Sequence, residues 1–312
     1  MGAPLLKSQE VNMNQFQMLR RILFLGVIGT CAVLLLVAPP ALAQQLSGPP
    51  ANPQYKYSTP LPPGIACPDT VKTRLGTLHF FDGFPDKASA EKLYNNLDFQ
   101  RAVQAYLFAI PIVSQAANRD AFRTLGPPNT VVPIFEQLLD SRGIVLTGND
   151  NTVYSWTWID LDKGPIVLEV PPKVLGTVND MWQRWVVDVG ITGPDKGRGG
   201  KYLFLPPGYK GKVDKAGYVA IVHSPTYSLW IPWRSFLVNG DPKPGVALVK
   251  KFTKIYPLAD AAKPHPPLKF VDMSGKPFNT VYPAGYRFWK LLNEVVQEEP
   301  RDSLDQIRLG YF

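Results

Sequence analysis

Residues 151–170, with the sequence NTVYSWTWIDLDKGPIVLEV, decide the fold class of the chain. The first half of this stretch alternates, so that Tyr154, Trp156 and Trp158 fall on one face of an extended strand. The Asp-Lys-Gly-Pro sequence at 162–165 is typical of a turn, and a second apolar run follows it. The pattern therefore predicts a β-hairpin whose first strand is lined with aromatic side chains.

Four more strands are expected after this hairpin, because short β-branched and aromatic runs alternate there with loops rich in Gly and Pro. They are predicted over residues 182–190, 201–205, 217–223 and 229–238. The connections between successive strands are short, which favours a mainly antiparallel sheet, either closed into a β-barrel or folded in a sandwich-like manner.

Helical spacing of apolar residues precedes and follows these strands. Asp86 is suited to begin a helix, a second helix is expected from Asp98, and Pro111 is expected to end or kink that second helix. A shorter helical segment is predicted over 114–123, and another helical stretch over 246–255.

A clear amphipathic helix is expected near the C-terminal end, around residues 288–296, bounded by Gly285 and Pro300. The predicted class is therefore α+β: N-terminal helices, then a mainly antiparallel β-barrel or sandwich-like sheet, then a C-terminal amphipathic helix.

The N-terminal region has the features of an export signal. Two arginines precede an apolar run at 22–38, and the Ala-Leu-Ala sequence at 41–43 is typical of a cleavage site. The sequence predicts a signal peptide over 1–43, a mature start near Gln44 and a periplasmic or secreted protein. The alternative is an uncleaved anchor, since the run approaches the length of a spanning helix.

The remaining chain is expected to have three parts. Residues 44–70 predict a disordered, Pro-rich leader, 71–245 a helix-plus-sheet domain, and 246–312 a helical and irregular extension. The formal net charge of the whole chain is +8, without a block of Lys and Arg that would indicate nucleic-acid binding. After cleavage Cys67 is the single cysteine, so no disulfide within the chain is expected.

Recognised catalytic and cofactor motifs are absent from the sequence. It contains no G-x-S-x-G, H-E-x-x-H, C-x-x-C or P-loop pattern, and the three histidines (His79, His223 and His265) are isolated. His223 and Ser224 make a poor nucleophile pair, because adjacent strand residues point to opposite faces. We therefore expect no cofactor and no metal site.

Aromatic and acidic residues of the predicted strands are the candidates for a site. Asp160 shares the face of Tyr154, Trp156 and Trp158, and Asp188 lies on another predicted strand. Sugar rings bind to aromatic side chains flanked by polar groups, and glycosidases use two carboxyl groups. Asp160 and Asp188 are thus candidate catalytic residues, and the three aromatic residues are candidate ligand-binding residues. The alternative is that these aromatic residues only fill the core.

Arg234 is the basic residue most in need of an explanation, because it lies within the aromatic run YSLWIPWRSF. A guanidinium in such a strand requires a carboxylate, a ligand anion or solvent. Arg234 is therefore a candidate ligand-binding residue. The alternative is a structural ion pair with Asp188 or Asp160.

Several stretches carry a family resemblance. They are residues 73–113 (TRLGTLHFFDGFPDKASAEKLYNNLDFQRAVQAYLFAIPIV), 151–171, 180–209 (which contains DMWQRWVVDVG and GKYLFLPPGY) and 223–242 (HSPTYSLWIPWRSFLVNGDP). In this order they resemble the bacterial domain-of-unknown-function family number 1254. The resemblance implies a helical segment leading into a β-barrel-like sheet, and it supplies no catalytic residues.

Members of that family usually carry a companion domain, family number 1214, which resembles a β-sandwich, and the two-domain form has been linked to carbohydrate handling. The resemblance implies that the companion domain would begin at Phe312, where this chain ends. We therefore expect either that the chain is truncated relative to a two-domain ancestor or that the partner is separately encoded. Our main hypothesis is an exported cell-envelope protein that binds or processes a glycan or another small molecule.

Two other hypotheses belong to different classes. One is a non-enzymatic scaffold or assembly module that docks a separately encoded β-sandwich or a second copy of itself. The weaker one is a hydrolase of small esters or amides. Neither nucleic acid nor a membrane is expected as a partner, except for a membrane bound through an uncleaved signal segment.

Overall fold

The computed structural model describes Gly64 and residues 68–301. The chain divides into two units, residues 1–69 and 70–312, and every described helix and strand belongs to the second unit. The predicted signal peptide and nearly all of the predicted leader therefore lie outside the described residues. No helix within the described part has both the length and the apolar character needed to cross a bilayer.

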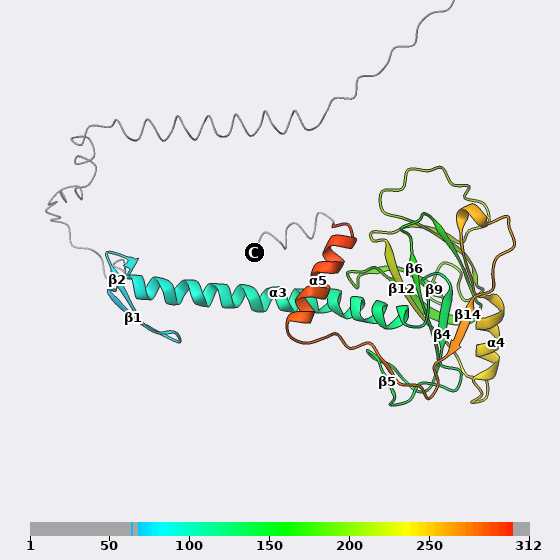
Figure 1. The fold of residues 1–312 in the computed structure, drawn as a ribbon, viewed down its shortest axis with the longest axis horizontal. Helices are drawn as coiled ribbons and strands as arrows, with labels where there is room; N and C mark the ends of the chain where they lie inside the picture. Colours follow the sequence, from blue (N-terminus) through cyan, green and yellow to red (C-terminus); the bar gives the residue numbers. More distant parts are fainter. Residues whose placement is uncertain (1–63, 65–67, 302–312) are drawn as a thin grey trace, which may run out of the picture. The chain divides into compact units, whose positions relative to one another are not determined.

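The second unit contains helices and strands in one chain, which confirms the α+β class (Figure 1). The described helices are α3 (Lys87–Arg123), α4 (Lys243–Phe252), α5 (Tyr286–Glu298) and the short 3₁₀ helix η1 (Leu258–Asp260). The described strands are β1 (Thr70–Thr73), β2 (Gly76–Phe81), β3 (Phe84–Pro85), β4 (Val131–Ile134), β5 (Gly143–Ile144), β6 (Val153–Asp160), β7 (Ile166–Val170), β8 (Val174–Asn179), β9 (Trp185–Gly190), β10 (Gly200–Leu205), β11 (Ala220–His223), β12 (Ser228–Ser235), β13 (Lys254–Pro257), β14 (Lys269–Asp272) and β15 (Phe278–Asn279).

Two larger sheets form the β part of the fold. One has the strand order β14-β4-β6-β12-β8-β9 and the other has the order β11-β10-β7-β13. Most neighbouring strands are antiparallel, as expected, whereas β14 with β4 and β10 with β11 are parallel. Both sheets have free edges, so the described strands do not close into a barrel.

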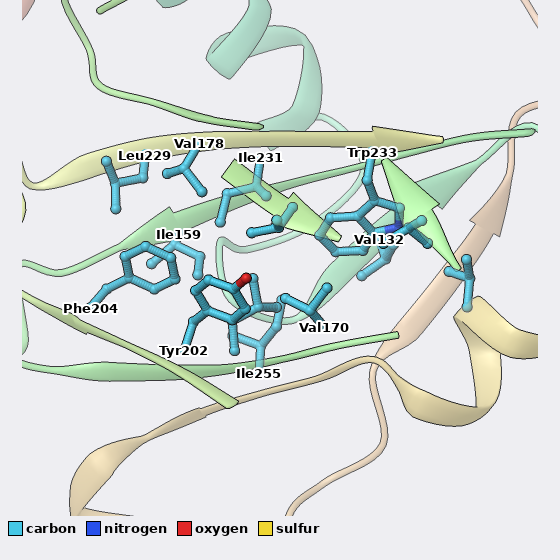
Figure 2. Packing of buried hydrophobic residues seen from close by; sticks show 14 of the residues in the cluster. Val132, Ile159, Val170, Val178, Tyr202, Phe204, Leu229, Ile231, Trp233 and Ile255 are labelled. Atoms are coloured by element: carbon cyan, nitrogen blue, oxygen red, sulfur yellow. The ribbon is translucent and has the colours of Figure 1, made fainter. Parts of the chain in front are cut away.

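One hydrophobic core contains side chains from both larger sheets (Figure 2). Leu229, Ile231 and Trp233 of β12 contribute to it from the six-stranded sheet, and Tyr202 and Phe204 of β10 contribute from the four-stranded sheet. All five side chains are almost completely buried. Every second side chain of β12 therefore points into this core, and the side chains between them point to the opposite face of the sheet.

Gly176 in β8 allows the close approach of β8 and β12. A Cβ atom at this position would lie 2.6 Å from the Trp233 Cβ atom and 2.6 Å from the Pro232 carbonyl oxygen. Such contacts are far shorter than van der Waals distances, so a larger residue would push the two strands apart. This glycine thus fixes the spacing of two strands that also line the candidate site.

The long helix α3 corrects one expectation from the sequence. It begins after Asp86, whose side chain caps it as predicted, and it continues without a break through Asp98 and Pro111. The separate helices expected at Asp98 and after Pro111 are not formed. Pro111 removes one backbone hydrogen bond, but Ala109 and Val113 are buried in the same core cluster on both sides of it. Packing therefore outweighs the cost of the proline.

Several strands differ from their expected limits. The strand expected over 182–190 begins only at Trp185, and the helix expected over 246–255 is α4 followed by β13. Strands β4, β8, β13 and β14 were not expected at all. The C-terminal amphipathic helix is confirmed as α5, which begins after Gly285.

A second hydrophobic cluster covers part of the other face of the six-stranded sheet. It joins Trp156 and Trp158 of β6 to Phe122 of α3, and the ring centroids of Phe122 and Trp156 lie 5.8 Å apart. Helix α5 belongs to the same cluster, since the rings of Tyr106 and Phe288 lie 4.8 Å apart. The helices leave another part of this face uncovered, where the candidate site lies.

Candidate functional site

A cavity of about 380 Å³ lies on the uncovered part of the six-stranded sheet. The neighbouring strands β6, β12, β8 and β9 all contribute to its walls. Leu146, Thr147 and Thr192, which are exposed, lie at its border. The cavity is therefore built mainly on paired strands, which hold side chains more rigidly than loops do.

Strand register explains why the candidate residues meet in this cavity. Arg234 is paired with Tyr154, Pro232 with Trp156, and Thr177 with Asp188. Residues directly opposite each other on neighbouring antiparallel strands point to the same face. As a result, the predicted site residues Tyr154, Trp156, Asp188 and Arg234 all line one cavity.

The other two predicted site residues lie elsewhere. Trp158 and Asp160 border a separate hollow of about 20 Å³, together with Arg119 and Phe122 of α3. The helix covers this end of β6, so the aromatic face expected from the sequence is divided. The Asp160 carboxylate accepts a hydrogen bond of 2.9 Å from the backbone N–H of Asp162, which gives it a role in the turn.

The rings of Tyr154 and Trp156 are mainly core side chains. Only 9% and 4% of their surfaces are exposed, and their centroids lie 5.7 Å apart. The Tyr154 hydroxyl accepts a hydrogen bond of 2.9 Å from the Asn149 side chain. Phe135 packs against Trp156 with a centroid distance of 5.1 Å. These two rings therefore offer a rigid edge to the cavity rather than a broad platform.

Trp230 and Trp233 also line the cavity, although neither was a candidate site residue in the sequence analysis. Trp233 is 1% exposed and belongs to the core. Trp230 is only partly buried, and the register places it opposite Trp158 and Asn179. Its Nε1–H and the Thr177 hydroxyl are buried and have no hydrogen-bond partner in the described part of the chain. Because Trp230 alternates with the core residues Leu229 and Ile231, this alternation was the signal that could have identified it.

Asp188 and Arg234 are the two charged residues among the described residues that line the cavity. The Asp188 Oδ1 atom accepts a hydrogen bond of 2.9 Å from the Trp185 indole N–H. Arg234 is partly buried, and its side chain makes no hydrogen bond or ion pair with any residue that the structure describes. The alternative expectation of an ion pair with Asp188 or Asp160 is wrong.

The sheet geometry explains why that ion pair does not form. Strand β8 lies between β12, which carries Arg234, and β9, which carries Asp188. Two strand spacings amount to about 10 Å. Asp160 is at the far end of β6, where it is paired with Ser228. The two charges of the cavity are therefore held apart on its floor.

The turn between β8 and β9 is held by the buried residue Asp180. Its carboxylate accepts backbone hydrogen bonds of 2.9 Å from Trp182 and 2.7 Å from Arg184, and it forms an ion pair with the Arg184 side chain. Burial raises the pKa of Asp180, and the contacts with Arg184 and Trp182 oppose that rise in pKa. The Gln115 side chain of α3 donates to the Asp180 carbonyl oxygen at 3.3 Å. These contacts fix the hairpin that carries Asp188.

The cavity does not have the donor set of a metal site. Within residues 68–301, no group of three His, Cys, Asp or Glu side chains lies close enough to hold an ion. The cavity is instead suited to a polar organic ligand. Its lining offers one carboxylate, one guanidinium, hydroxyl and amide groups, and the edges of aromatic rings.

Comparison with known proteins gives a family match over the part of the chain that contains the cavity. Residues 128–257 match the model of a family described as "Protein of unknown function (DUF1254)". All residues that line the cavity fall within this range. No curated protein matches the chain.

A match among solved structures is the VPA0106 protein from Vibrio parahaemolyticus. It is 18% identical in sequence, with a TM-score of 0.44, and the match covers 66% of this chain and 48% of that protein. The chain thus spans about half the length of the solved protein.

Proposed function

Because residues 128–257 of this chain form a domain of the DUF1254 family, which has no assigned activity, we propose a function from the cavity within that domain. The proposed function is that of an exported cell-envelope protein that binds carbohydrate in this cavity. The predicted export signal supports this compartment, and the core that the two larger sheets share supports a sandwich-like scaffold for the site.

The observation that carries this proposal is the meeting of aromatic, hydroxyl and charged side chains in one cavity. Trp230 and the edges of Tyr154 and Trp156 offer apolar surface, and Asp188 and Arg234 offer hydrogen bonds. Sugars present apolar C–H faces together with hydroxyl groups, and they need both kinds of contact. The volume of about 380 Å³ lies within the range of roughly 300–1,000 Å³ that is common for small-molecule sites.

We favour binding over glycoside hydrolysis. A glycosidase of the usual type needs two carboxyl groups across the scissile bond. Asp188 is the single carboxylate among the described residues of the cavity, and Asp160 lies at a different hollow. The ester or amide hydrolase receives no support from Ser224, whose hydroxyl donates to the Thr226 carbonyl oxygen while His223 is exposed.

Trp230→Ala should weaken glycan binding about two- to tenfold, since an aromatic contact contributes about 0.5–1.5 kcal/mol. The measurement is a glycan array on the purified protein, followed by isothermal titration calorimetry with the best ligand. Trp289→Ala on α5 is the matched control, because Trp289 does not line the cavity. Thermal melting would verify that both variants are folded. A folded wild-type protein that binds no glycan would disprove the proposal.

A second candidate function is a docking module, and the surface of α3 favours it. The N-terminal and middle parts of this helix expose large apolar side chains, among them Tyr94 (67%), Phe99 (68%) and Leu107 (58%). A helix that is apolar on several faces is usually covered by another element. This surface is suited to a companion β-sandwich domain or a second copy of the chain.

Phe99→Asp should abolish such docking, because it places a charge in the centre of the apolar surface. Size-exclusion chromatography with light scattering, over a wide range of protein concentrations and with and without the co-expressed companion domain, would measure it. Phe81→Asp on β2 is the control, since Phe81 is exposed to 78% but lies outside α3. A wild-type protein that stays monomeric and binds no companion would exclude this function.

A further inference from the structure

We propose that the cavity selects carbohydrate that carries a carboxylate, such as a uronic acid, and that Arg234 binds this carboxylate. The inference depends on the proposed carbohydrate-binding function and names the ligand class of the same site. It rests on the position of the Arg234 side chain and on the charges around it.

Arg234 differs from the other arginines that are removed from solvent. Among the described arginines, Arg119, Arg184 and Arg234 are buried or partly buried, and all others are exposed. Arg119 lies 2.8 Å from a Glu298 oxygen, and Arg184 lies 2.9 Å from an Asp180 oxygen. Arg234 has no such partner among the described residues. Partial loss of hydration without a carboxylate is unfavourable, so this guanidinium is available for a ligand anion.

The backbone around Arg234 prevents it from moving away from the cavity. It lies on β12, which has a neighbouring strand on each side, and it is paired with Tyr154 on β6 and Leu175 on β8. Both of these neighbours also line the cavity. The guanidinium is thus presented from the floor of the site, where its planar set of N–H donors matches the two oxygens of a carboxylate.

The second charge of the cavity favours a ligand with a single negative charge. Asp188 would repel the additional charge of a phosphate group, whereas one of its oxygens remains available for sugar hydroxyls beside the bond to Trp185. Strand β8 lies between the strand with Arg234 and the strand with Asp188, so one ligand can place its carboxylate at Arg234 and its hydroxyls at Asp188. Trp230 can contact the sugar ring between these groups.

The test uses isothermal titration calorimetry on the full chain with four probes: glucuronate, its neutral isostere glucuronamide, glucose and acetate. We expect glucuronate to bind at least tenfold more tightly than glucuronamide and glucose, and acetate to bind far more weakly. Arg234→Gln should remove this preference, so that the variant binds glucuronate no more tightly than it binds glucuronamide. Arg198→Gln, at an exposed arginine outside the cavity lining, is the matched control and should keep the preference.

The outcomes separate this inference from the proposed function. Binding of glucose and glucuronamide without a preference for glucuronate would overturn the inference and leave carbohydrate binding intact. Failure of all sugars to bind the folded wild-type protein would overturn both. Acetate that binds as tightly as glucuronate would overturn the assignment to an acidic sugar, in favour of small organic acids. If Arg234→Gln does not fold, the wild-type comparison of glucuronate with glucuronamide decides the result.

Discussion

Asp195→Ala should reduce the free energy of unfolding by about 3–5 kcal/mol, the largest single effect that we expect. Asp195 is completely buried, and its carboxylate accepts backbone hydrogen bonds of 2.7 Å from Gly190 and 3.0 Å from Gly199. It also accepts a hydrogen bond from the Tyr202 hydroxyl. Burial raises the pKa of Tyr202, and the bond to Asp195 raises this pKa further. Alanine would remove the acceptor of two buried donors, the Gly190 N–H and the Tyr202 hydroxyl, and of the partly buried Gly199 N–H.

Urea denaturation followed by tryptophan fluorescence would measure this loss. Asp214→Ala is the control, because the exposed Asp214 carboxylate accepts only a local hydrogen bond of 3.0 Å from the Ala216 backbone. We expect the control to change the free energy of unfolding by less than about 1 kcal/mol. Equal denaturation midpoints for the two variants would contradict the assigned role of Asp195. Thr192, at the border of the cavity, lies in the loop that Asp195 holds, so ligand binding should weaken as well.

Glu299→Ala should cost about 2–4 kcal/mol of stability, because it would leave two backbone donors unpaired. Glu299 directly follows α5 and is exposed to only 4%. Its carboxylate oxygens accept hydrogen bonds of 2.6 Å from the Tyr227 N–H and 3.0 Å from the Ser228 N–H. The side chain thus joins α5 to the start of β12, and chemical denaturation of the variant would measure the contribution of this link.

The pH dependence of stability provides an independent check on Glu299. Burial raises the pKa of Glu299 above its ordinary value of 4.5. The folded state therefore binds the proton of the Glu299 carboxyl group more tightly than the unfolded state does. Protonation of Glu299 stabilises the folded state fully at pH values below 4.5, and this stabilisation is lost as the pH rises through the raised pKa. Glu299→Gln cannot titrate. We subtract the unfolding free energy of Glu299→Gln from that of the wild type. This difference should be larger at acidic than at neutral pH. A difference that does not change with pH would contradict the burial of the Glu299 carboxyl group.

The sequence predicted the local features of the fold well. The Asp86 cap, helix α5 and the alternation in β6 and β12 each depend on neighbouring residues, and all are present in the structure. Strand β8 was missed although it lines the cavity; it pairs with β9, which follows it in the sequence, but its other partner β12 is distant. A short strand of this kind is defined by its neighbours in space rather than by its own pattern.

The candidate site was predictable only in part, for the same reason. The alternation of side chains along β6 placed Tyr154 and Trp156 on one face, and the pairing of β12 with β6 brings Arg234 to the same face. Alternation also predicted Trp158 and Asp160 on this face, but the C-terminal part of α3 covers that end of the strand. The position of a helix over a sheet depends on tertiary packing, and the periodicity of a single strand does not contain that information.

The alternation of β12 has a consequence for how this domain can diversify. Leu229, Ile231 and Trp233 belong to the core, whereas Trp230, Pro232 and Arg234 lie between them and line the cavity, which Trp233 also borders. Substitutions at Trp230, Pro232 and Arg234 should change the surface of the cavity and leave the packing of the core in place. The lining of the cavity can therefore change at a few alternate positions of one strand without loss of the scaffold.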